Sequence, residues 1–192
     1  MLLTETSIHA FGTELEERGL EPPGHTSRLV RLVESMGLML GRDSESLEVL
    51  IQSAYLHDVG KLILPERILL KASTLDPAEW AVVRTHTRWS VEIARAIPSV
   101  RPGTLETILH HHERWDGGGY PGGLTGNEIP FEARLLAVCD VYDTLLSKRP
   151  YSRAWTAQAT LEEIQIRSGK HFDPNIVDMF LERALGKLTV TG

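Results

Sequence analysis

The chain has 192 residues, of which 42% are hydrophobic and 24% charged, and this composition is typical of a globular domain rather than a disordered chain. Its 20 Lys and Arg residues against 26 Asp and Glu residues give a net charge of −6. The arginines are scattered and form no basic stripe, so binding to a nucleic-acid polymer is not expected. A single cysteine, Cys139, excludes an internal disulfide framework and favours a reducing compartment. We therefore expect a cytoplasmic location.

Membrane insertion is not expected either. The longest stretch without Asp, Glu, Lys or Arg runs from Gly117 to Asn127, which is far shorter than a membrane span. The first residues lack the basic start and apolar core of a signal peptide.

Apolar residues recur at three- and four-residue steps through most of the chain, which predicts helices, and strand-like alternation is nearly absent. Two such repeats run from Leu29 to Leu40 and from Leu47 to Tyr55. A helix is expected to start at Asp76, a capping residue followed by Pro77, and to continue to about Ile97. Further helices are expected from 102 to the histidines at 110–112, and over 131–147, 156–167 and 174–184.

The irregular part of the sequence is Asp116–Pro130, which contains six glycines and two prolines. Loops of this length usually carry function. The sequence therefore predicts an all-α helical bundle with one long Gly-rich loop. A short helical segment over residues 1–20 is expected to precede the main domain over residues 21–192.

Histidines and acids stand at positions where helices could bring them together. His57-Asp58 ends an apolar helical run, and His111-His112-Glu113 lies where a helix meets the Gly-rich loop. Asp140 lies in the middle of a helix among apolar neighbours, where a carboxylate is costly unless it is paired or binds a metal. Helical bundles build dinuclear metal sites from such inward-pointing groups, and mixed imidazole and carboxylate ligands favour iron, manganese or zinc over calcium.

Taken singly, these residues also have plainer interpretations. His25 and His86 each stand in a helical segment, where a lone histidine is more often an ordinary side chain. Asp140 could be a helix carboxylate bonded to an arginine, and the histidines at 110–112 could be a solvated cluster. His9 and His110 have no companions and are expected to be incidental. The order of the whole set along the chain favours the metal interpretation.

Two motifs resemble a known family. His57-Asp58-Val59-Gly60-Lys61 matches the HD-x-G-K signature of HD-superfamily phosphohydrolases, and residues 111–121 match the H-H-E-x-x-D-G-x-G-Y-P motif of the HD-GYP subfamily. Shorter matches lie at Lys71, over Arg134–Tyr151 and at Phe172-Asp173-Pro174. The resemblance covers about residues 18 to 181.

This resemblance implies an HD-superfamily bundle in which residues 21–192 form the catalytic domain. The implied activity is a bacterial phosphodiesterase that hydrolyses cyclic di-GMP to linear pGpG and often onward to GMP. Two or three divalent ions, with iron or manganese first, would hold a hydroxide that attacks the phosphorus in line. The implied metal ligands are His25, His57, Asp58, His86, His111, His112 and Asp140, with Glu21 added in a branch that holds a third ion.

Substrate contacts are implied as well. Asp58 would act at the catalytic centre, and Lys61, one helical turn later, could reach a phosphate oxygen. Arg149 matches a family arginine that holds phosphate. The next family basic position is Ser152 here, and Arg153 beside it is the candidate for the second contact.

The Gly-rich loop has implied roles of its own. Gly119, Tyr120 and Pro121 would border the substrate pocket, and in some relatives this tripeptide meets diguanylate cyclase domains. Glu113 and Asp116 are expected to orient histidines or to anchor the loop. A second departure from the family lies after His86, where a glycine position is Ser90 and Trp89 precedes it. These two residues would either narrow the pocket wall or fill core.

Two other functions remain open at this point. One is an HD phosphohydrolase that acts on a different nucleotide. The other is a non-catalytic module that binds cyclic di-GMP or cyclase domains. Degenerate members of the second kind usually lose metal ligands or the GYP tripeptide, and this chain keeps both.

Overall fold

The computed structural model describes residues 5–147, 154–184 and 186. Over these residues it contains helices and no β-strand, which confirms the all-α prediction. The helices are α1 (Glu5–Glu17), α2 (His25–Met39), α3 (Ser44–Leu56), η1 (Val59–Ile63), α4 (Glu66–Leu69), α5 (Pro77–Arg84), α6 (His86–Arg95), α7 (Pro102–His110), η2 (Gly126–Glu128), α8 (Phe131–Leu146), α9 (Ala157–Ile166) and α10 (Pro174–Ala184). None of the described helices combines the length and the apolar character that crossing a bilayer requires.

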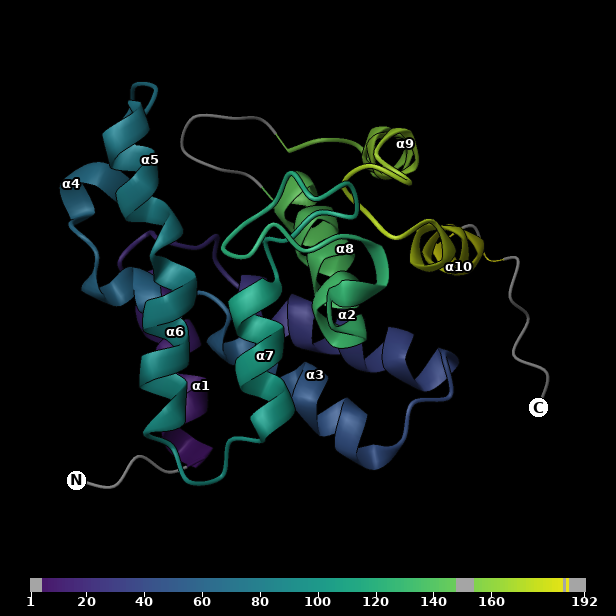
Figure 1. The fold of residues 1–192 in the computed structure, drawn as a ribbon, viewed down its shortest axis with the longest axis horizontal. Helices are drawn as coiled ribbons and strands as arrows, with labels where there is room; N and C mark the ends of the chain where they lie inside the picture. Colours follow the sequence, from purple (N-terminus) through teal and green to yellow (C-terminus); the bar gives the residue numbers. More distant parts are fainter. Residues whose placement is uncertain (1–4, 148–153, 185, 187–192) are drawn as a thin grey trace.

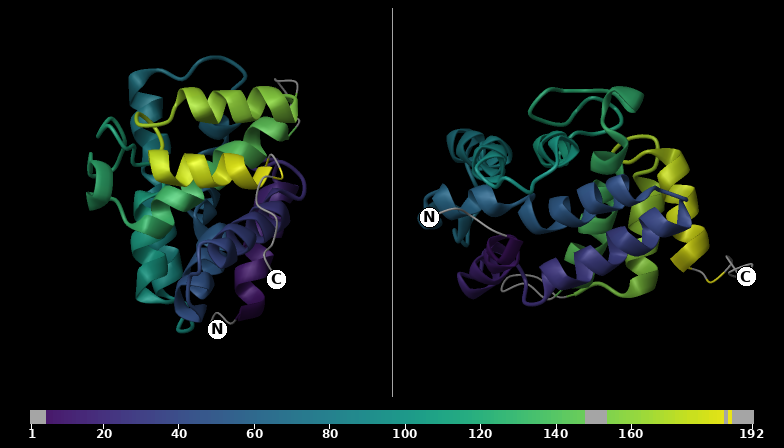
Figure 2. Two further views of the ribbon diagram at one scale, coloured as in Figure 1. Left: turned by 90° about the vertical axis from the view of Figure 1, so that its right-hand side faces the viewer. Right: turned by 90° about the horizontal axis from the view of Figure 1, so that it is seen from below.

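The helices pack around two hydrophobic cores (Figure 1). The larger core joins α2, α3, α8, α9 and α10 and includes the fully buried Leu29, Leu135 and Phe172. The smaller core joins α1, α3, η1, α6 and α7 through residues such as Val59 and Ile108. Figures 1 and 2 show α1 and α6 at one side of the molecule and α9 and α10 at the other. Helix α3 contributes to both cores, and its C-terminal end lies between them.

The N-terminal helix belongs to this packing. Ile8 of α1 is buried in the smaller core, and α1 contacts α3 and η1. The expected boundary at residue 20, between a short N-terminal segment and the main domain, stays a prediction.

The helix expected from Asp76 to Ile97 is two helices, α5 and α6, which meet at Thr85. Asp76 caps α5 as predicted, because its side chain accepts hydrogen bonds from the backbone N–H groups of Ala78 and Glu79. At the other end the Thr85 hydroxyl donates to the Val82 carbonyl at 2.6 Å, and the Thr85 N–H bonds the same carbonyl. Threonine side chains compete with helical hydrogen bonds in this way. The break makes His86 the first residue of α6.

Helix α6 and η1 approach each other unusually closely. A Cβ atom on Gly60 would lie 2.1 Å from the carbonyl oxygen of His86 and 2.6 Å from the backbone nitrogen of Ser90. Only glycine fits at such a distance. Gly60 of the first motif therefore allows the His57-Asp58 turn to pack directly against the start of α6.

The long loop is held by backbone contacts to the turn before α10. The N–H groups of Trp115 and Asp116 bond to the carbonyl oxygens of His171 and Lys170 at 3.1 and 2.8 Å. Arg134 of α8 closes the other end, because its Nε donates to the carbonyl of Ile129 at 3.0 Å. The loop is thus fixed to the bundle on both sides.

Candidate metal centre and substrate cavity

Three of the predicted ligand histidines are oriented by their own backbone. The ring Nδ1 atoms of His57, His86 and His111 lie 3.2, 2.7 and 2.7 Å from the carbonyl oxygens of Ala54, Val83 and Ile108, respectively, three residues earlier in each case. Because a carbonyl oxygen only accepts hydrogen bonds, this contact places the ring proton on Nδ1. Each Nε2 atom is left with a free lone pair that can bind a metal.

His25 is oriented by a side chain that the sequence analysis did not single out. Its Nδ1 lies 2.8 Å from Oδ2 of Asp143, and both residues are buried. Arg28 holds the same carboxylate, with Nε 2.7 Å from Oδ1 and Nη2 3.0 Å from Oδ2. The signal was present in the sequence, because Asp143 stands one helical turn beyond Asp140. No arginine pairs with Asp140 among the described residues, and Arg28, the arginine near it, binds Asp143 instead.

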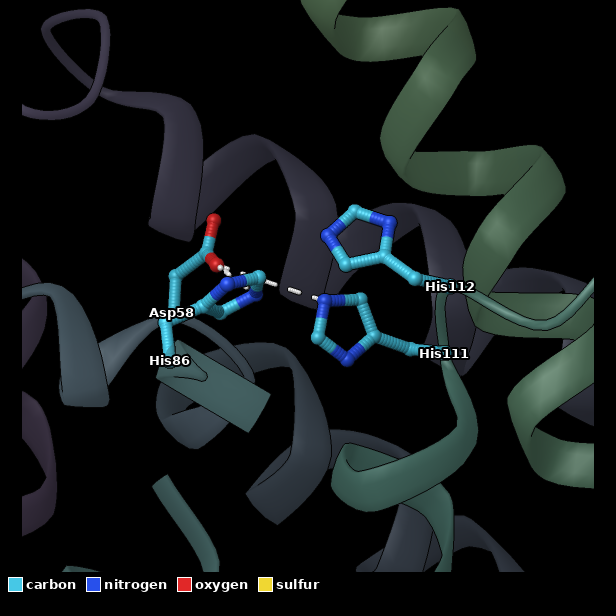
Figure 3. A group of neighbouring side chains, drawn as sticks. All are labelled: Asp58, His86, His111 and His112. Carbon is cyan, nitrogen blue, oxygen red and sulfur yellow. Dashed lines mark ion pairs between the residues drawn. The ribbon is translucent and has the colours of Figure 1, made fainter. Parts of the chain in front are cut away.

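The predicted ligands gather in two groups, and within each group all ligand atoms lie within 4.8 Å of one another. The first group consists of Asp58, His86, His111 and His112 (Figure 3). The second group consists of His25, His57 and Asp140. Helices α2, α3, α6, α7 and α8 thus each bring ligands from their ends or faces to the space between the two cores.

Asp58 lies between the two groups. Its Oδ1 is 3.1 Å from Nε2 of His86 and 4.0 Å from Nε2 of His111, and dashed lines mark both contacts in Figure 3. Its Oδ2 is 3.2 Å from Nε2 of His57 in the second group. A carboxylate whose two oxygens face two sets of imidazoles is suited to bridge two cations.

The donor set fits divalent metal ions. Eight buried side-chain atoms have no hydrogen-bond partner among the described residues, and five of them belong to the two groups, namely the Nε2 atoms of His25, His57, His86 and His111 and Oδ1 of Asp58. A buried polar atom left unpaired costs about 1–3 kcal/mol, so this concentration is unusual for a purely structural cluster. Cations with nitrogen and oxygen ligands would satisfy all five atoms. The buried His111 also excludes the solvated-cluster interpretation for that residue.

The electrostatics of the first group favour the neutral form of His111 and His112. Burial and the neighbouring His112 hold the pKa of His111 well below its usual range. Burial and His86 lower the pKa of His112 to about 3. Burial acts in the same direction on His57, but Asp58 outweighs it and raises the pKa of His57 to about 9. Neutral imidazoles are the form that binds metals, so a cation bound beside Asp58 would displace the extra proton that this carboxylate otherwise holds on His57.

Glu21 and Lys61 lie at the edge of the second group. Lys61 donates to Glu21 and, at 2.6 Å, to Oδ2 of Asp58. The buried Glu21 carboxylate also has Oε2 3.8 Å from Nε2 of His25. Burial favours the neutral amine, but Asp58 and Glu21 together raise the pKa of Lys61 above its usual value. Glu21 is therefore adjacent to the cluster without belonging to either group.

A cavity of about 990 Å³ lies against the cluster. It is lined by members of both groups, including Asp58, His112 and Asp140, and by Lys61. Its volume is at the upper end of the range for small-molecule sites. The structure therefore combines the candidate ligands with a space large enough for a substrate.

Part of the GYP tripeptide lines this cavity. Gly119 and Tyr120 are lining residues, and Pro121 is not among them. The Tyr120 ring stacks on His112, with 4.8 Å between ring centroids. A Cβ on Gly119 would lie 2.4 Å from the backbone nitrogen of Arg114, so the loop needs glycine there. The predicted contacts Arg149 and Arg153, and Ser152 between them, lie outside the described residues.

Glu113 and Asp116 hold the loop rather than the histidines of the two groups. The Glu113 carboxylate accepts hydrogen bonds from the N–H groups of Gly122 at 2.5 Å and Leu124 at 3.1 Å. Asp116 accepts from the N–H of Gly118 at 2.9 Å and pairs with Arg114. Of the two expected roles, these contacts support anchoring.

Ser90 neither narrows the pocket wall nor simply fills core, because its hydroxyl makes two specific hydrogen bonds. Its buried hydroxyl accepts a hydrogen bond from the N–H of Gly60 at 2.9 Å and donates to the carbonyl of His57 at 2.7 Å. It therefore ties α6 to the turn that carries the His57-Asp58 pair. Trp89 is 43% exposed, and neither residue lines the cavity.

Comparison with known proteins gives one family and several relatives. A family model described as "HD domain" matches residues 14–176. The chain is 35% identical over 184 residues to 3'3'-cGAMP-specific phosphodiesterase 2 of Vibrio cholerae, 41% over 197 residues to cyclic di-GMP phosphodiesterase response regulator RpfG of Xanthomonas campestris, and 39% over 203 residues to a cyclic di-GMP phosphodiesterase of Thermotoga maritima. These alignments cover 94–95% of the chain but 35%, 52% and 54% of the relatives. The chain thus spans about a third to a half of their length.

Solved structures share the fold. A cyclic GMP-AMP specific phosphodiesterase of V. cholerae superposes with a TM-score of 0.72 at 21% identity, over 96% of this chain and 50% of that one. An HD-GYP-type protein of Bdellovibrio bacteriovorus superposes with a TM-score of 0.65 at 20% identity, over 84% of this chain and 51% of that one.

Proposed function

The chain belongs to the HD domain family, and we propose that it is a metal-dependent phosphodiesterase that hydrolyses cyclic di-GMP to linear pGpG, GMP or both. The observation that carries the proposal is the position of Asp58. Its two oxygens face two groups of unpartnered imidazoles beside a cavity of about 990 Å³. The match of 94–95% of the chain to relatives named cyclic di-GMP phosphodiesterases supports this assignment.

Two divalent ions would be held by the two groups, with Asp58 shared between them, and Glu21 is the candidate ligand of a third. Iron or manganese suits this mixture of imidazole and carboxylate ligands. Such ions supply charge that stabilises a phosphoryl transition state and lower the pKa of bound water. The remaining steps fall to the side chains of this chain.

Lys61 is placed to hold a phosphate oxygen of the substrate. Its ammonium group lines the cavity and already lies 2.6 Å from Oδ2 of Asp58, so a phosphate beside Asp58 would be within its reach. A cation at this point offsets negative charge that develops during hydrolysis. Arg149 and Arg153 stay predicted phosphate contacts. Tyr120, stacked on His112, offers the substrate an aromatic face.

A second cyclic dinucleotide, 3'3'-cGAMP, is a competing substrate. A relative at 35% identity is named for it. Both dinucleotides contain the same phosphodiester linkages, so the described metal groups serve either one. The non-catalytic alternative is disfavoured, because each predicted histidine ligand and Asp58 is buried or half-buried within one of the two ligand groups.

Three further parts of the proposal concern context. Residues 21–192 would form the catalytic domain. Hydrolysis would take place in the cytoplasm, where the buried free Cys139 stays reduced. Docking of diguanylate cyclase domains on the GYP loop, which the resemblance implies, stays a prediction that no contact in the described residues supports.

An assay of purified protein tests the proposal. The protein is loaded anaerobically with Mn²⁺ or Fe²⁺ and incubated separately with cyclic di-GMP and 3'3'-cGAMP, and the products are resolved by chromatography. We expect hydrolysis of cyclic di-GMP that is abolished in His57→Ala and Asp58→Ala. The control is His9→Ala, because His9 is exposed and lies outside both ligand groups. Preferred hydrolysis of 3'3'-cGAMP would select the competing substrate, and tight binding without turnover would support the binding module.

A further inference from the structure

Helix α5 has no residue in either hydrophobic core. None of its eight residues is buried, although Trp80, Ala81, Val82 and Val83 are apolar. The helix is held by its capping box at Asp76, by contacts with α4 and α6, and by an ion pair between Lys71 and Glu79. Figure 1 shows α4 and α5 standing together at one end of the molecule, away from α9 and α10. Because α5 contributes no fully buried side chain to a core, its apolar side chains are expected to serve another purpose than core packing.

One face of α5 lines the cavity beside the metal groups. Pro77, Trp80, Ala81 and Arg84 stand at positions i, i+3, i+4 and i+7 and share this face, and all four line the cavity, as does the neighbouring Val83. Trp80 is 47% exposed. Exposed tryptophan at a cavity wall offers a stacking surface for a planar ring, and base-on-aromatic stacking is a general way to bind nucleotides.

Arg84 adds positive charge to the same wall. Its Cζ lies 5.2 Å from the centroid of the Tyr120 ring in the Gly-rich loop. The other two cationic lysine and arginine side chains that line the cavity are occupied, Lys61 by Asp58 and Glu21 and Arg114 by Asp116. Arg84 has no ion pair within the part of the chain that the structure describes. A guanidinium with its hydrogen-bond donors free suits a phosphate, which it can contact with two parallel bonds.

We propose that α5 is a substrate-binding wall, in which Trp80 stacks on one nucleobase of the cyclic dinucleotide and Arg84 binds one of its phosphates. This inference rests on the proposed function and extends it to residues that neither motif contains. The occupant follows from the chemistry of the wall. An aromatic surface and a free guanidinium, one helical turn apart, match a base and a phosphate of the same ligand.

Steady-state kinetics of the metal-loaded protein test this wall. KM and kcat are measured for cyclic di-GMP, 3'3'-cGAMP and cyclic di-AMP with Trp80→Ala, Trp80→Phe and Arg84→Ala. Loss of one stacking contact should raise KM for the hydrolysed dinucleotides by about 5- to 100-fold in Trp80→Ala, with a smaller change in kcat, and Trp80→Phe should recover most of the loss. Arg84→Ala should raise KM roughly tenfold and by the same factor for every dinucleotide, because a phosphate contact does not read the base.

Matched controls come from α6. Trp89 is 43% exposed and Arg88 is exposed, and neither lines the cavity. Trp89→Ala and Arg88→Ala should keep wild-type KM, and metal content by elemental analysis should be the same in all variants.

Three results would contradict the proposed substrate-binding role of α5. The first is a KM within twofold of wild type in Trp80→Ala. The second is an equal loss in the Trp89 control. The third is an Arg84→Ala effect confined to guanine-containing substrates, which would make Arg84 a base contact. If the wild-type protein hydrolyses none of the dinucleotides, the proposed function is itself contradicted, and the substrate-binding role of α5 is contradicted with it.

Discussion

Replacing Asp143 by asparagine separates the support of His25 from the ligand itself. The substitution keeps the shape of the side chain but removes its negative charge. In the wild-type protein the Asp143 carboxylate accepts hydrogen bonds of 2.7 and 3.0 Å from Arg28 and lies 2.8 Å from Nδ1 of His25. Hydrogen bonds to charged groups contribute about 1.5–3 kcal/mol each, and breaking a buried pair costs about 3–5 kcal/mol. The Arg28 side chain is 37% exposed and can be rehydrated, so we expect a loss of about 2–3 kcal/mol.

The same change should weaken metal binding, because the carboxylate fixes the ring orientation of His25. Partners that orient a ligand in this way typically change metal affinity by 10- to 100-fold. Equilibrium dialysis against Mn²⁺ measures the affinity, and urea unfolding measures the stability.

The control for this variant is Asp43→Asn. Asp43 caps α3 by accepting a hydrogen bond from the N–H of Ser46, and asparagine caps helices equally well. Both stability and affinity should therefore stay at wild-type values in the control. A loss of stability in Asp143→Asn with unchanged Mn²⁺ affinity would refute the positioning role and leave Asp143 as a structural ion pair.

Three other changes have clear expected outcomes. Ser90→Ala leaves a buried N–H and a buried carbonyl of the His57–Gly60 turn unpaired and should lower the free energy of unfolding by about 2 kcal/mol. The control Ser53→Ala removes a buried hydroxyl without a described partner and should not lower it. Equal urea midpoints for the two variants would contradict this expectation. Burial and nearby arginines lower the pKa of His171 to about 4, so between pH 7 and pH 4 only the unfolded chain takes up this proton and stability falls; His171→Gln should remove about 1–2 kcal/mol of that fall, after allowance for partial exposure. Tyr120→Ala should keep the metal content and raise KM, and loss of metal would show that Tyr120 has a different role.

Much of the candidate site could be predicted from the sequence, because its chemistry is local. The His57-Asp58 pair is adjacent in the chain, and the loop motif from His111 to Pro121 is continuous. Helix boundaries such as the Asp76 cap depend on hydrogen bonds within a few residues. These features need no knowledge of how distant helices pack.

The missed features depend on packing between distant segments. The contacts of Asp143 with His25 and Arg28 join residues 118 and 115 positions apart. The hydroxyl of Ser90 meets the His57-Asp58 turn only because Gly60 lets α6 approach it. The break at Thr85, which separates α5 from α6, likewise has no strong signal in the apolar pattern. Periodicity describes the faces of a helix but does not identify the surface that each face meets.

We expect side chains from five helical segments to hold at least two divalent ions around Asp58. Elemental analysis of anaerobically purified wild-type protein and of Asp58→Ala, prepared in parallel, counts these ions. We expect two or three ions per chain in the wild-type protein and a loss of at least one in the variant. Fewer than one ion per chain in the wild type, or an unchanged count in Asp58→Ala, would contradict this expectation.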